Sequence, residues 1–190
     1  MKQLFGTFTL VMAWVVPAHA LDNYAMDPAH CIPVFEFKHL GLTTQTGRFD
    51  KVQGTITLDR DAKVGSVTYN VETDSLNMGF GTATSNSPGY HLFEVVKFPK
   101  IRFVSDELFF DDEKNVVAAA GKHTLLGITK PVTVWVNHFK CAVNPMIQKL
   151  MCAGNITATV KRSEFGMLSF IPAISDEIKI NVPIEAYKTE

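Results

Sequence analysis

The segment Asn155-Ile156-Thr157-Ala158-Thr159-Val160-Lys161-Arg162 alternates polar and apolar side chains from end to end. Because successive side chains of a strand leave on opposite faces, this pattern predicts a β-strand with one face toward water. The apolar face carries Ile156, Ala158 and Val160 and then ends in Arg162. An arginine in this position indicates that a hydrophobic interior ends at an anionic group. That group is either a structural carboxylate or the head group of a ligand whose tail fills the interior.

The first twenty residues have the pattern of a secretory signal peptide. Lys2 precedes the apolar run Leu4–Val16, and the small residues of Ala18-His19-Ala20 follow. The run is too short to cross a bilayer, which takes about 20 residues. We expect cleavage after Ala20 and one domain over residues 21–190. Leu21 is not a cysteine and no second membrane-length run follows, so we expect an exported protein without stable membrane insertion.

Composition excludes one class of partner and leaves two roles for the aromatic residues. Without Lys2, acidic residues slightly outnumber basic ones, so the mature chain has no basic excess with which to hold nucleic acid. The chain has 14 phenylalanines, which is many for its length. They either pack a core or line a cavity.

Most of the mature chain alternates in short segments separated by Gly, Pro, Asn and Asp. About eight segments have strand length: 35–39, 47–58, 64–71, one beginning at 101, 116–125, 132–139, 151–162 and 178–186. Without amphipathic helices between them, they predict an all-β fold in which an antiparallel sheet closes or folds over itself. A barrel of about eight strands has an interior that side chains fill or that holds one ligand. Pro183 cannot donate a ladder hydrogen bond, so we expect it at a bulge or where the strand end is unpaired.

Two segments do not alternate. Residues 87–97 predict one or two helical turns with Leu92, Phe93 and Val96 as their apolar side. Residues 167–175 form an apolar loop. Either segment is suited to cover a mouth of the barrel.

The three cysteines have two expected roles. Cys141 and Cys152 bracket the turn signal Asn144-Pro145, so they can pair if they flank a hairpin loop. Such a disulfide is permitted in an exported chain and contributes about 2–3 kcal/mol. Cys31 is then left over, and its place before the segment 32–35 predicts a small buried hydrophobic residue rather than a reactive thiol.

The polar candidates for a site each have an ordinary structural alternative. Arg162 either grips a phosphate bidentately or forms an ion pair with a carboxylate such as Asp176 or Glu164, and the ion pair is favoured. His30, His39 and His138 stand at candidate inner positions, where a lone histidine is more often a core residue whose hydrogen bonds are satisfied. The chain has no Gly-x-Ser-x-Gly elbow, no Cys-x-x-Cys pair and no phosphate-binding glycine loop. Its scattered histidines do not predict a metal site or a cofactor.

Four segments, in order along the chain, carry a family resemblance. They are 24–30 with 35–41 and 47–49; 92–95 with 98–103; 121–132, which reads Gly-Lys-His-Thr-Leu-Leu-Gly-Ile-Thr-Lys-Pro-Val; and 161–167 with 174–178. Together they resemble the YceI-like family of exported lipid-binding proteins. The resemblance implies a lipocalin-like eight-stranded antiparallel barrel with a short helical segment near one mouth. It also implies a bound isoprenoid, either a polyprenyl phosphate or a quinone, in the periplasm. Cys31 stands where the family usually has Ser, and the region around His91 departs from the family pattern.

The resemblance also carries a set of site residues and supports the Cys141–Cys152 disulfide. We expect the isoprenoid tail to contact inward apolar and aromatic residues: Phe35, Phe37, His39, Phe49, Leu92, Phe93, Phe103, Val134, Ala158, Val160, Arg162, Phe165, Met167 and Phe170. His30 and Arg162 are the candidates for the head group. Small residues expected inside, Ala118, Ala120 and Ala158, would leave room for a tunnel.

The leading prediction is a non-catalytic carrier of an isoprenoid lipid that needs no cofactor. Pairing of two copies of the chain stays open. Two other interpretations also stay open: an enzyme acting on a lipid head group, and a structural or partner-binding barrel without a ligand.

Overall fold

The computed structural model describes residues 21–79 and 88–189, so the expected signal peptide lies outside the described residues. The strands are β1 (Asp22–Met26), β2 (Val34–His39), β3 (Thr43–Phe49), β4 (Val52–Asp59), β5 (Val64–Glu72), β6 (Leu76–Asn77), β7 (Lys100–Phe110), β8 (Val116–Leu125), β9 (Ile128–Val143), β10 (Leu150–Lys161) and β11 (Glu177–Lys188). The helical segments are η1 (Thr73–Ser75), α1 (Pro88–Leu92) and η2 (Arg162–Phe165).

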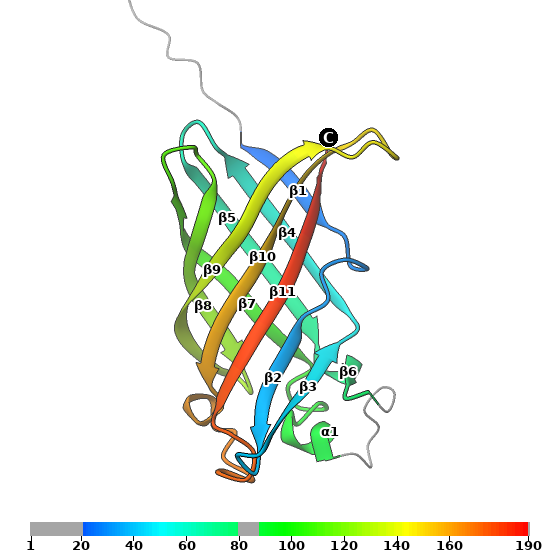
Figure 1. Ribbon diagram of the computed structural model, residues 1–190, viewed down its shortest axis with the longest axis vertical. Coiled ribbons are helices and arrows are strands. Elements are labelled where there is room, and N and C mark those ends of the chain that lie inside the picture. The colour runs from blue at the N-terminus through cyan, green and yellow to red at the C-terminus, as the bar shows by residue number, and fades with distance from the viewer. Residues whose placement is uncertain (1–20, 80–87, 190) are drawn as a thin grey trace, which may run out of the picture.

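Eight of these strands close into an antiparallel barrel (Figure 1). They run in the order β1, β4, β5, β7, β8, β9, β10, β11, and pairing of β1 with β11 closes the ring. The remaining strands β2, β3 and β6 continue from the edge of β11. The prediction of an all-β, eight-stranded antiparallel barrel is therefore confirmed.

The membership of the ring differs from the sequence prediction in one respect. The expected strand over 47–58 is interrupted at Asp50 and Lys51, where β3 ends and β4 begins. β1, which the sequence pattern did not reveal, pairs with both β4 and β11 and completes the ring. The number of expected segments thus equals the number of strands in the ring, but the ring contains β1 and does not contain β2, the expected segment 35–39.

The strands β10 and β11 form the most regular part of the wall. Their register continues without a shift from Met151 opposite Tyr187 to Lys161 opposite Glu177. In β11, Pro183 lies between the residues that pair with β2, Lys179–Asn181, and those that pair with β1, Ala186–Lys188. Pro183 lies inside β11 opposite Asn155 of β10 with no register shift, so the expected bulge or unpaired strand end is not found there; within the described chain, neither β1 nor β2 pairs with its other edge.

A bulge in β9 reverses the alternation on which the position of His138 was predicted. Asn137 lies opposite Asn155 and Lys140 opposite Ala153, so His138 and Phe139 together face the single residue Gly154. His138 takes a left-handed backbone with φ of 56°, and the extra residue turns the following side chains over. His138 is therefore exposed, and the expectation that it points inward was wrong.

A second bulge changes which alanines face the interior. Phe109 lies opposite Ala118 and Phe110 opposite Val116, which leaves Val117 as the extra residue of β8. As a result Val116 and then Ala119 line the interior. Ala118 and Ala120 do not, so of the three small residues expected inside only Ala158 holds that place.

Both non-alternating segments lie at the lower end of the barrel in Figure 1. Leu92, at the end of α1, and Phe93 point toward the interior, as expected. Glu94 has a φ of 44°, which ends the helical geometry. Val95 is consequently buried and Val96 is 84% exposed, so the expectation that Val96 belongs to the apolar side was wrong.

The cysteines have the roles expected of them. Cys141 and Cys152 form a disulfide between directly opposed positions of β9 and β10. Cys31 is fully buried, and its thiol donates to the carbonyl oxygen of Glu185 at 3.3 Å. Burial raises the pKa of this thiol, which suits a packed rather than a reactive side chain.

Candidate functional site: an apolar cavity inside the barrel

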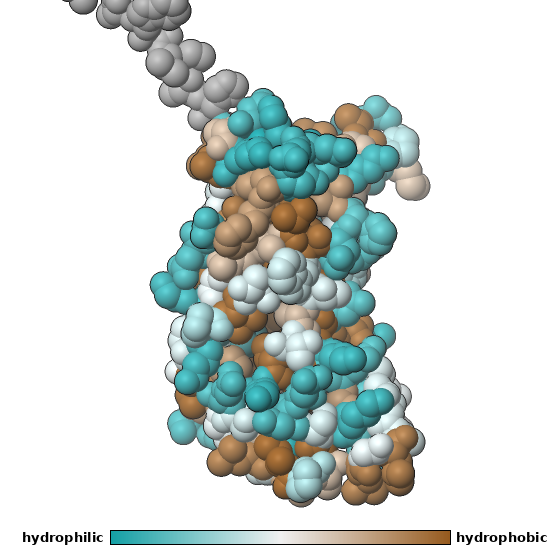
Figure 2. All heavy atoms as spheres, turned by 60° about the vertical axis from the view of Figure 1, so that its left-hand side comes forward, coloured by the Kyte–Doolittle hydropathy of each residue, from teal (hydrophilic) through white to brown (hydrophobic). Residues whose placement is uncertain are grey.

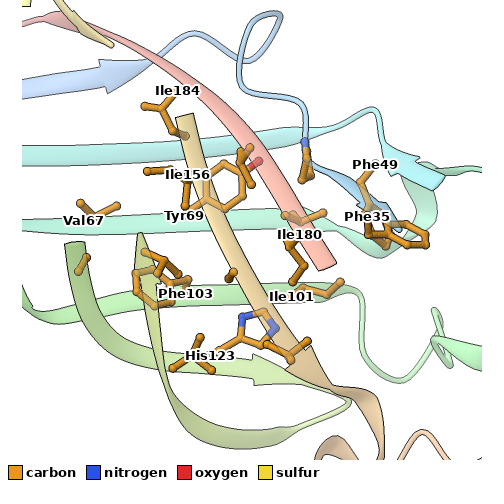
Figure 3. Close-up of a pocket in the computed structure, with 18 of the residues that line it drawn as sticks. Phe35, Phe49, Val67, Tyr69, Ile101, Phe103, His123, Ile156, Ile180 and Ile184 are labelled. Atoms are coloured by element: carbon orange, nitrogen blue, oxygen red, sulfur yellow. The ribbon is translucent and has the colours of Figure 1, made fainter. Parts of the chain in front are cut away.

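The barrel encloses a cavity of about 690 Å³ (Figure 3). Well-packed protein interiors contain few voids larger than a water molecule, whereas pockets for small ligands measure about 300–1,000 Å³. The barrel strands supply most of the wall, and Leu92, Phe93, Met167 and Ile174 line it from the two segments at the lower end. The interior is therefore a ligand-sized space and not a filled core.

Inward faces of the regular strands form much of this wall. The inward face of the segment 155–162 lines the cavity, as the alternation predicts, with Ile156, Ala158, Val160 and Arg162. In Figure 3 Ile156 and Ile180 point into the same space from neighbouring strands. Eleven of the expected ligand contacts lie at the cavity wall: Phe35, Phe37, Phe49, Leu92, Phe93, Phe103, Val134, Ala158, Val160, Arg162 and Met167. Whether they contact a ligand stays a prediction.

Four expected site residues lie away from the cavity wall. His39 is exposed at the end of β2, where its backbone bridges to Ile174. Phe165 is only 1% exposed, but it packs in the core behind the wall. Phe170 is 60% exposed in the loop 166–175, at the end where apolar side chains gather in Figure 2. His30 is exposed, and its Nδ1 lies 2.8 Å from Asp27 Oδ2, a contact that raises the pKa of His30.

Arg162 has a different set of partners from either interpretation of the sequence. The side chain is 3% exposed, and Nε, Nη1 and Nη2 donate to the carbonyl oxygens of Ser175, Met167 and Ile174 at 2.9–3.0 Å. No carboxylate of the described residues lies within ion-pair distance of these nitrogens, so the expected direct ion pair with Asp176 or Glu164 is not formed, although the charge of Asp176 still interacts with the guanidinium. Burial lowers the pKa of the guanidinium. Arg162 therefore ties down the loop 166–175.

Asp176 also stabilises this end of the barrel, but its carboxylate forms no hydrogen bond with the guanidinium of Arg162. Its carboxylate accepts hydrogen bonds from the backbone N–H and the hydroxyl of Ser163, both at 2.8 Å. These bonds hold the pKa of Asp176 below its usual value. The carboxylate thus fixes the start of η2, and the guanidinium fixes the loop that follows.

Two tyrosines on the cavity wall also have protein partners. The hydroxyl of Tyr69 donates to the carbonyl oxygen of Cys31 at 2.6 Å, and burial raises the pKa of this phenol. The hydroxyl of Tyr24 lies 3.5 Å from Asp22 Oδ2.

His123, like Tyr24 and Tyr69, is a polar residue of the cavity wall that was not among the expected site residues. It lies on β8 opposite Phe103, and its ring meets Phe165 edge to face at a centroid distance of 5.3 Å. Figure 3 shows the ring pointing into the cavity near Ile101 and Phe103. The sequence holds a signal for His123, because Gly121, His123 and Leu125 share one face of a strand.

Burial lowers the pKa of His123 to about 4, so we expect this residue to make stability depend on pH. In the unfolded chain the pKa is about 6.5, and the unfolded state therefore binds the extra proton between these values. The free energy of unfolding should fall by roughly 3 kcal/mol as the pH drops from 7 to 4. Urea unfolding at a series of pH values measures this slope.

Two variants control the pH experiment. H123L should remove most of the slope, whereas H30A should not, because the raised pKa of His30 acts with the opposite sign at an exposed site. Equal slopes for the parent protein and H123L would show that another group titrates.

Other kinds of site find little support in the part of the chain that is described. Over residues 21–79 and 88–189, no group of three or more His, Cys, Asp or Glu side chains is placed to hold a metal ion. The same residues include no helix that is both long and apolar enough to cross a membrane.

Known proteins of the same kind match along nearly the whole chain. A family model described as YceI-like domain matches residues 24–186. A UPF0312 protein of Shewanella denitrificans is 27% identical over 171 residues, covering 87% of each chain. Protein YceI of Salmonella arizonae is 22% identical over 187 residues, covering 97% of this chain and 96% of the relative.

Solved structures show the same fold. BcnA of Burkholderia cenocepacia superposes with a TM-score of 0.65 at 22% identity, covering 84% of this chain and 98% of BcnA. A polyisoprenoid binding domain from Saccharophagus degradans superposes with a TM-score of 0.60 at 13% identity, covering 87% and 98%. With the family model matched over residues 24–186, the chain belongs to the YceI-like family.

Proposed function

We propose that this protein binds a long-tailed isoprenoid lipid in the barrel cavity and carries or sequesters it without chemical change. The observation that carries the proposal is the cavity of about 690 Å³ with walls of aliphatic and aromatic side chains. Burial of a prenyl chain contributes about 0.8 kcal/mol for each CH₂-sized group, so tail contacts would dominate affinity. The related fold of a domain named for polyisoprenoid binding supports the same ligand class.

The polar groups of the cavity support binding rather than catalysis. The three nitrogens of Arg162 each donate to a backbone carbonyl, and the Tyr69 hydroxyl donates to another. General acid–base catalysis needs a titratable group within hydrogen-bond reach of the reacting atom, usually with a partner that tunes it. His123 alone supplies a free imidazole, with no carboxylate bonded to it among the described residues.

Export to the periplasm belongs to the same proposal. The signal-like segment 1–20 and the Cys141–Cys152 disulfide both fit an oxidising compartment. A carrier in this compartment would shield a water-insoluble tail.

Native mass spectrometry of the gently purified protein, followed by organic extraction, tests the proposal. We expect a retained lipid with an isoprenoid tail, and after delipidation we expect rebinding whose affinity rises with the number of isoprene units. The result that would overturn the proposal is an empty protein that also refuses prenols, prenyl phosphates and isoprenoid quinones of every length. Turnover of a bound lipid would favour an enzyme instead.

A further inference from the structure

We propose that His123 is the hydrogen-bond partner of an uncharged oxygen on the bound lipid, so that the cavity selects a carbonyl or hydroxyl head over a phosphate. This inference rests on the proposed lipid-binding function and specifies its ligand class. The His123 ring makes an edge-to-face contact with Phe165, and Phe103 lies opposite His123 in the register of β7 and β8. Among the described residues none forms a hydrogen bond with either ring nitrogen.

The imidazole of His123 is half-buried and lines the cavity, so its ring nitrogens are open to what the cavity contains. Most buried polar side-chain groups have at least one hydrogen-bond partner, and a neutral imidazole offers one donor and one acceptor. The other polar side chains of the cavity wall, Tyr24, Tyr69 and Arg162, all have partners within the protein. His123 is thus the side chain whose hydrogen bonds the cavity contents can supply.

His123 has no charged partner among the described residues, which suits an uncharged ligand atom at this position. The titratable groups that line the cavity are Tyr24 from β1, Tyr69 from β5, His123 from β8 and Arg162 from η2, with no carboxylate among them. In the sheet His123 lies between Phe103 of β7 and Lys130 of β9; Lys130 is exposed, and so is Lys122, the preceding residue on β8. Burial without an anionic neighbour keeps the imidazole uncharged at neutral pH.

Arg162 is the one cation among the described residues of this wall, and the protein already engages it: three of its N–H groups donate to backbone carbonyls and its charge interacts with that of Asp176. A buried anion needs a paired charge or several donors, so a phosphate head would compete with these partners for Arg162. A quinone carbonyl or a prenol hydroxyl loses much less hydration on entry, and one neutral donor or acceptor satisfies it. The polar end of the ligand would then lie near His123, and its tail would extend along the barrel toward Cys152 and Ile184.

Four probes with tails of equal length separate head-group recognition from tail burial. They are an isoprenoid quinone, a prenol, the matching prenyl phosphate and the matching hydrocarbon, each titrated into delipidated protein. We expect the parent protein to bind the quinone or the prenol more tightly than the phosphate. H123L should weaken the preferred neutral oxygen ligand by about threefold to tenfold, the range for one hydrogen bond, and leave the hydrocarbon unchanged. The quinone and prenol arms distinguish a carbonyl from a hydroxyl partner.

Matched variants and a spectroscopic signature complete the test. H123N, which keeps a donor and an acceptor, should retain part of the preference, and K122L, an outward neighbour on the same strand, should leave all four affinities unchanged. The ¹⁵N shifts of the His123 ring, identified by their loss in H123L, should move with the oxygen ligands and not with the hydrocarbon.

Two results would overturn the inference. One is a parent protein that prefers the phosphate, and the other is an H123L variant that binds all four probes unchanged or with equal losses. Failure of the parent protein to bind any of the four probes would instead contradict the proposed function itself.

Discussion

Replacement of Ala158 by phenylalanine should weaken the binding of long-tailed lipids about 100-fold while the barrel stays folded. Ala158 lies on β10 opposite Ile180, and both residues line the cavity. A phenyl ring at this position would occupy space that the tail needs. If it displaces about four CH₂-sized groups, the loss is about 3 kcal/mol, or roughly 100-fold in affinity.

The free energy of unfolding should stay level or rise in A158F, because a side chain placed in an existing cavity buries apolar surface. T159F is the matched control, since Thr159 is the next residue and is exposed on the outer face. Titration of each delipidated variant with one isoprenoid lipid, together with urea unfolding, measures both effects. Parent-like affinity in A158F would place the ligand outside the cavity, and an equal loss in T159F would indicate a general effect on the barrel.

Replacement of Arg162 by alanine should have the largest effect on stability. The guanidinium is 3% exposed and donates to the carbonyl oxygens of Met167, Ile174 and Ser175. Its removal leaves three carbonyls of the loop without their donor, and losses of this kind cost about 3–5 kcal/mol. Urea unfolding measures the loss, and hydrogen exchange should show the fastest gain in amide exchange over residues 166–175.

The control for this variant is K161A, which removes the exposed charge of the preceding residue and should change stability little. R162K keeps the charge but cannot reach three carbonyls from one planar group, so it should recover only part of the stability. The opposite result would be an R162A variant that is stable and exchanges its amides like the parent protein but fails to bind a prenyl phosphate. That result would show that Arg162 contacts the head group of the ligand.

The regular parts of the fold were predictable because alternation is a local property. In β10 and β11 no register shift intervenes between the two strands, and the inward residues Ile156, Ala158 and Val160 follow from counting by twos. His138, Ala118 and Ala120 were predicted on the wrong face of their strands because a register shift does occur there. A single extra residue in β9 and in β8 turns the later side chains to the other face.

The polar part of the site was less predictable than its apolar wall. The position of Arg162 at the end of an apolar face was correct, but its partners are backbone carbonyls, which every residue carries and no sequence pattern distinguishes. His123 could be placed on an inward face from Gly121 and Leu125. The sequence could not predict that His123 lacks a hydrogen-bond partner, because this depends on which groups the other strands of the barrel bring near its ring.

The sequence by itself determined an all-β barrel, the inward faces of its regular strands, the disulfide and the resemblance to the YceI-like family. These follow from spacing along the chain. Only the tertiary structure decided that β1 completes the ring, that Arg162 holds a loop and that the interior stays open around His123. The size of that interior depends on strand number and stagger around the whole barrel, and on side chains that meet from distant segments, so no local pattern encodes it.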